Sequence, residues 1–206
     1  MHFIGRQYKE TWRFIGKDLR WIFLGTIVFF IAFIVLTDLF FNNHPEEMKQ
    51  VIDTFSATVE EISPDGEISA PHLFLNNLRA CAVAVLLGLI PFLFVTALTL
   101  IANAAVMGAV GAMYRMTGRS VAVMYLAGIL PHGIFELPAI LLSISMGLYI
   151  CYCLVKRICE GRYNRGIVKK ALANSLRTFL CLIVPLLAVA ALIETYVTPI
   201  LLTHFI

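Results

Sequence analysis

Hydrophobic and polar positions divide the chain into blocks, and five of the blocks are about as long as a bilayer is thick. The apolar blocks cover about 21–41, 72–94, 96–114, 121–155 and 178–198. An α-helix needs about 20 apolar residues to cross the hydrocarbon core. The pattern therefore predicts an all-α fold, a polytopic transmembrane helical bundle of about five spans that forms one helical domain over 21–206.

The fourth apolar block is too long for one upright helix. It carries no lysine or arginine from Val121 to Val155, whereas roughly 20 residues suffice for a crossing. Pro131, Gly133 and Pro138 interrupt it, and prolines inside a helix remove a hydrogen bond and favour a kink. We expect a broken or re-entrant helix at 121–138, followed by a full span.

Residues 1–20 precede the first span and have a helical pattern of their own. Apolar residues recur at spacings of three and four, while basic residues occupy the other faces: Arg6, Lys9, Arg13, Lys17 and Arg20. This pattern is typical of an amphipathic interfacial helix that lies on an anionic membrane surface. Docking on a cytoplasmic partner such as a membrane-associated ATPase is the alternative.

The charges between the spans indicate how the chain is oriented. Loop 42–71 has seven acidic residues and a single Lys49, while loop 156–177 has seven lysines and arginines. Basic connections stay in the cytoplasm, so we expect the acidic loop outside and the basic loop inside. Five crossings then place the amino terminus in the cytoplasm and the carboxyl terminus outside. Arg115 and Arg119 oppose this bias but are outnumbered.

The overall composition agrees with a membrane protein. The chain is 60% hydrophobic and 14% charged, whereas soluble domains carry about 25% charged residues. The net charge of +3 is small and is distributed as topology requires. We therefore expect membrane lipid, and no nucleic acid, as a partner.

Several ionisable and amide side chains fall inside the predicted spans, where they are costly and often functional. Counting about 1.5 Å per residue from the span ends places them at similar depth in the outer half of the bundle. This predicted intramembrane polar cluster contains Asn77, Arg79, Asn103, His132, Glu136 and Glu194. His132 and Glu136 are four residues apart and so share a helix face.

The residues of this cluster allow three interpretations. The side chains could satisfy one another in a purely structural network. Alternatively, a half-helix starting at Pro131 could hold an anionic group in a transport site. His132, Glu136 and Glu194, with a water, could also ligate a metal such as zinc in an intramembrane hydrolase. The sequence has neither HExxH nor a second intramembrane histidine, so we expect no catalytic residue, metal or cofactor.

One stretch of the sequence resembles the signature of a known family. The run at 130–139 reads LPHGIFELPA, and supporting features are Asn76-Asn77, Asn103 and AALIETYVTP at 190–199. Together they resemble the stage II sporulation protein M family from about residue 73 to 199. The matching positions are Asn77, Asn103, Pro131, His132, Gly133, Glu136, Pro138, Glu194 and Pro199.

This resemblance implies a five- or six-span membrane protein without an established catalytic activity. In endospore formers the family member acts in engulfment as a scaffold for cell-wall hydrolases, the stage II sporulation proteins D and P. Other relatives occur beside ATPases or transport components. We therefore predict a non-enzymatic scaffold in the bacterial inner membrane; a transporter or channel component is the alternative, and a metal-dependent intramembrane hydrolase is less favoured. The small residues Ala104, Gly108 and Ala112 would permit a homodimer.

Overall fold

The computed structural model describes residues 2–62, 69–160 and 166–205, and all regular structure in these ranges is helical. Five helical segments are long and apolar enough to cross a membrane: Phe3–Asn43, Ala70–Leu87, Thr96–Met116, Val121–Glu160 and Ile167–His204. The predicted all-α fold with about five spans is confirmed. The chain is a multi-pass membrane protein.

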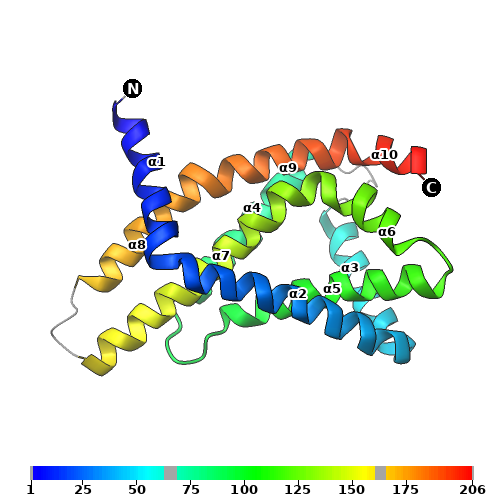
Figure 1. Cartoon of the computed structure of the whole chain (residues 1–206), viewed down its shortest axis with the longest axis horizontal. Coiled ribbons are helices and arrows are strands. Elements are labelled where there is room, and N and C mark those ends of the chain that lie inside the picture. The colour runs from blue at the N-terminus through cyan, green and yellow to red at the C-terminus, as the bar shows by residue number, and fades with distance from the viewer. Residues whose placement is uncertain (1, 63–68, 161–165, 206) are drawn as a thin grey trace.

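The first segment joins an amphipathic helix to a transmembrane helix. Helix α1 (His2–Phe14) leads through a π-helical turn, η1 (Ile15–Leu19), into α2 (Arg20–Asn43). Figure 1 shows α1 leaving the end of α2 at a steep angle. Phe14 and Leu19 are buried in the core at this junction, while Tyr8 and Trp12 are exposed. The bend therefore directs α1 across the end of the bundle.

A helix occupies most of the acidic segment between the first two spans, over a longer stretch than the short helix expected at about Val51–Ile62. Helix α3 (Pro45–Ile62) begins with proline followed by Glu46 and Glu47, which favour a helix start by fixed φ and by interaction with the helix dipole. Its partly buried residues Met48, Val51 and Ile52 pack against Phe41, Ala109 and Ala112. These apolar residues recur at spacings of three and four, so they form one side of α3, which packs along α5 (Thr96–Met116).

Helix α7 (Leu130–Glu160) is the central element of the bundle. It follows α6 (Val121–Val123) and a π-helical segment, η2 (Met124–Ile129), so a short irregular segment precedes the full span where we expected the helix to break, and the chain stays helical between the two. The irregularity is the π geometry that precedes Pro131. Pro131 directly follows this π segment, whose shifted hydrogen bonds accommodate a residue without an N–H, and Pro138 lies within α7 without ending it.

Two core clusters surround α7. One joins Ala139, Leu142 and Met146 of α7 to Cys81 of α4 (Ala70–Leu87), to Ile183 of η4 (Phe179–Ile183) and to Leu187 of α9 (Val184–Tyr196). The other joins Leu141 and Ile144 to residues of α2, α4 and α5. In the segment that contains α7, 61% of the most apolar stretch is buried, against 39% or less of the corresponding stretch in each of the other four segments. Because α7 is buried among the other helices, its polar side chains have fixed positions inside the bundle.

The basic segment 156–177 is also more helical than expected. Helix α7 continues to Glu160, and α8 (Ile167–Thr178) runs through η4 into α9, which α10 (Thr198–Phe205) follows. Figure 1 shows α1, α8 and the end of α7 at one end of the bundle, with α3, α6 and α10 at the other. The basic and acidic segments therefore lie at opposite ends.

The small-residue stripe of α5 is used inside the chain. A Cβ atom at Gly108 would collide with the Thr37 side chain of α2 and lie 2.8 Å from the Asp38 backbone nitrogen. Ala104 and Ala112 are fully buried. Because α2 already covers this stripe, a homodimer would need a different surface.

Candidate intramembrane polar site

Three of the predicted cluster residues meet in space: His132, Glu136 and Glu194. One potential ligand atom from each lies within 4.8 Å of those of the other two. His132 Nε2 is 4.0 Å from Glu136 Oε2, and their side chains are only 14% and 18% exposed. We refer to these three residues as the His–Glu–Glu site.

Elements distant in sequence position these side chains. His132 and Glu136 lie one turn apart at the start of α7, while Glu194 lies near the end of α9, which packs against α7. After α9 the chain enters α10, where the buried Thr198 hydroxyl lies 3.2 Å from His132 Nδ1. On the other side, Asn77 of α4 lies near Glu136. Polar side chains of two further helices thus flank the site.

A cavity of about 510 Å³ opens beside the site. All three site residues line it, together with Asn103, Gly133 and mostly apolar residues: Phe30, Phe55, Met107, Leu137 and Ile140. The Asn103 amide donates to the Thr99 carbonyl oxygen at 2.7 Å, so it is bonded within α5. The site is accessible from this cavity and enclosed elsewhere by the bundle.

Arg79 does not join the His–Glu–Glu site. It is exposed and lines an adjoining hollow of about 410 Å³ with Asn76 and Asn103, while it is not among the residues that line the cavity of the site. Its depth was predicted by counting along the helix, but the direction of its side chain depends on the rotation of α4. That rotation is set by packing of Cys81 and Ala84 into the core, which turns Arg79 away.

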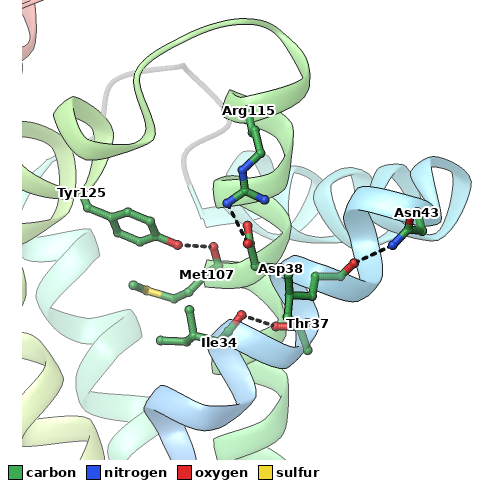
Figure 2. A network of polar contacts seen from close by, with 8 residues as sticks. Ile34, Thr37, Asp38, Asn43, Met107, Arg115 and Tyr125 are labelled. Carbon is green, nitrogen blue, oxygen red and sulfur yellow. Dashed lines mark hydrogen bonds and ion pairs between the residues drawn. The ribbon is translucent and has the colours of Figure 1, made fainter.

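A second polar network was missed by sequence reasoning. Figure 2 shows Asp38 of α2 paired with Arg115 of α5, and the Tyr125 hydroxyl of η2 directed at Met107. Arg115 Nη2 lies 2.8 Å from Asp38 Oδ2, and Tyr125 donates to the Met107 carbonyl oxygen at 2.9 Å. The sequence could have indicated this pair, because Asp38 lies near the end of the first apolar block and Arg115 directly follows the third. Both positions belong to the same side of the bilayer.

The His–Glu–Glu site has the donor atoms of a cation site. One imidazole nitrogen and two carboxylates are ligands that divalent transition metals accept, and the same groups can also share protons. Pro131 and Gly133 flank His132 and place it in the first turn of α7, while Pro138 follows Glu136. The predicted helix-breaking residues therefore surround the site without opening the helix there.

Comparison with known proteins identifies the family. The sequence pattern of the family described as Stage II sporulation protein M matches residues 23–199. The chain belongs to the stage II sporulation protein M family. The match includes the first span and α3, beyond the region from residue 73 that the motifs had indicated, and it contains all of the His–Glu–Glu site.

A relative of this family member occurs in Methanocaldococcus jannaschii. The two are 29% identical over 143 residues, which cover 69% of this chain and 78% of the relative, a protein described as uncharacterized. No solved structure matches the chain.

Proposed function

We propose that this chain is a non-enzymatic membrane scaffold that assembles cell-wall remodelling partners, in the manner implied by the stage II sporulation protein M family. The observation that carries the proposal is the family match over residues 23–199, which includes every predicted span. A scaffold needs surfaces that reach both sides of the membrane. The fold supplies one such surface at each end.

The basic end offers an amphipathic helix held in place by the bundle. Arg177 of α8 donates to the Gln7 side-chain oxygen of α1 at 2.7 Å, and Phe14 packs edge-on against Tyr149. Phe3 and Trp12 remain exposed on α1. Because basic ends stay inside, we propose that α1 faces the cytoplasm, toward lipid or a membrane-associated ATPase.

The acidic end offers the outer face of α3. Glu46 and Asp53 are exposed there, and Glu47 is exposed at the edge of the opposite face, which packs on α5. In the proposed orientation this face lies outside the membrane, where cell-wall hydrolases such as stage II sporulation proteins D and P work. We propose α3 as the surface that binds them.

Site-specific photocrosslinking in the native host tests the scaffold. A photoreactive residue at Glu47 or Asp53 should give adducts that contain a cell-wall hydrolase, identified by mass spectrometry. The matched control is Val28 of α2, which is 65% exposed on an apolar helix and should crosslink to lipid. The scaffold proposal fails if the α3 positions give no protein adducts beyond those at Val28.

A second function is favoured by the cavity beside the His–Glu–Glu site. Ionisable groups that line a cavity within a membrane are typical of ion or solute pathways, so the chain could be a transporter or channel component. Reconstituted vesicles would show ion or solute flux that falls when Glu136→Gln and Glu194→Gln are introduced. Flux that is absent, or indifferent to both changes, removes this alternative.

A further inference from the structure

We propose that His132, Glu136 and Glu194 bind one divalent transition-metal ion of the zinc class, within the membrane-spanning bundle. The three ligand atoms lie within 4.8 Å of one another and come from two helices. This site is independent of the scaffold proposal, because it depends on the side chains of α7 and α9 rather than on any partner.

The hydrogen bonds around His132 are compatible with a free Nε2. The Thr198 hydroxyl lies 3.4 Å from the Ile193 carbonyl oxygen and 3.2 Å from His132 Nδ1. When the hydroxyl donates to the carbonyl oxygen it accepts from Nδ1, and the proposed site uses this tautomer. A neutral imidazole with its proton on Nδ1 carries a lone pair on Nε2, the atom that points toward Glu136.

The site consequently brings together acceptors that lack a donor between them. His132 Nε2 and Glu136 Oε2 are 4.0 Å apart, too far for a hydrogen bond. The carboxylate of Glu194 lies beside both. Two carboxylates placed together away from water repel unless a positive charge or protons separate them. A divalent cation would neutralise both carboxylates and use the imidazole lone pair.

Among the described residues, no lysine or arginine lines this cavity, and Arg79 lines the adjoining hollow. Ligands about 2.1 Å from a tetrahedral ion lie roughly 3.4 Å from one another, so small rotations of the two glutamate side chains would close the site. The cavity leaves a fourth position open to a water.

The donor set selects among metals. Calcium and magnesium prefer oxygen ligands, whereas an imidazole with carboxylates suits zinc and its neighbours. Outer-shell partners that orient metal ligands are typical of such sites. The Thr198 hydroxyl beside His132 Nδ1 is placed as such a partner, and Asn77 lies near Glu136.

Zinc titration of the tag-free full chain in lipid nanodiscs tests the proposal, in competition with a fluorescent zinc chelator. We expect one ion per chain, and at least tenfold weaker binding in each of His132→Gln, Glu136→Gln and Glu194→Gln. Matched controls are His204→Gln and Glu47→Gln, which alter exposed residues and should bind as the wild type does. No zinc uptake by the wild type, or equal binding by the three site variants, overturns the site.

Thr198, whose hydroxyl lies beside His132 Nδ1, allows a test in which none of the three proposed ligands is changed. Thr198→Val removes the acceptor of the Nδ1 proton and should weaken zinc binding about tenfold or more, while Thr198→Ser keeps the hydroxyl and should bind normally. Cobalt substitution should give the visible spectrum of a nitrogen- and oxygen-ligated ion in both the wild type and the serine variant. Equal zinc affinity in the valine and serine variants contradicts the assigned role of Nε2.

Discussion

At the scale of single residues, Gly108 determines how closely α2 approaches α5. An added Cβ would meet the Thr37 side chain and the Asp38 backbone, and helix backbone yields less readily than a flexible side chain. Overpacking of this kind costs about 1–3 kcal/mol. Gly108→Ala should therefore lower the unfolding free energy by about that amount in detergent. Gly25→Ala is the matched control, because its Cβ would meet nothing within 4 Å and alanine favours helix; equal loss in both would contradict the close packing.

The Asp38–Arg115 pair makes a second prediction at this scale. The Asp38 side chain is only 15% exposed, so removing Arg115 leaves a mostly buried carboxylate without its charged partner. Arg115→Gln should destabilise the protein by about 1–3 kcal/mol. Adding Asp38→Asn should recover part of the loss, since the stranded charge is gone. Thermal unfolding of the two single variants and the double variant measures this, and additive losses would show that the pair is not coupled.

The sequence was informative about which polar residues lie at one depth and uninformative about which way they point. His132 and Glu136 share a helix face by their spacing, and Glu194 belongs to the helix that packs there. Arg79 failed to join them because core packing fixes the rotation of α4. Thr198 was missed because Thr198-Pro199 signals a helix start but does not show that the hydroxyl lies beside His132.

At the scale of elements, the apolar blocks predicted the spans well but not how the helices continue between them. Segments 42–71 and 156–177 are polar enough to suggest loops, yet α3 and α8 form there by amphipathic spacing. Likewise Pro131 and Pro138 suggested a broken helix. The π geometry of η2, directly before Pro131, takes up the irregularity there, while Pro138 lies inside α7.

Helix α1 gives a prediction at the element scale. Its steep angle to α2 (Figure 1) and its exposed Trp12 place the indole at the membrane surface if the amphipathic face contacts lipid. In a Trp21→Phe variant, which leaves Trp12 as the single tryptophan, quenchers attached near the lipid headgroup should reduce its fluorescence more than quenchers deep in the acyl chains. Quenching by neither set would mean that α1 contacts a protein or water instead.

At the scale of the whole molecule, the separation of charge between the ends of the bundle determines orientation. Lys169, Lys170 and most other basic residues lie with α1 and α8 at one end, while the acidic face of α3 lies at the other (Figure 1). Lysine and arginine near span ends resist translocation. Arg115 is an exception, because it lies at the acidic end. Its ion pair with Asp38 reduces the cost of translocating its positive charge.

Labelling with a membrane-impermeant maleimide tests this orientation. Cys159 is exposed near the end of α7, on the basic side, whereas Cys81, Cys151 and Cys153 are buried. With the other four cysteines replaced by alanine, Cys159 should react only after the cells are permeabilised, because the proposed orientation places it on the cytoplasmic side. A cysteine at Glu47 of α3, in a chain otherwise free of cysteine, should react in intact spheroplasts. The reverse pattern would invert the topology and transfer α3 to the cytoplasm, which would exclude cell-wall hydrolases as its partners while leaving the His–Glu–Glu site unaffected.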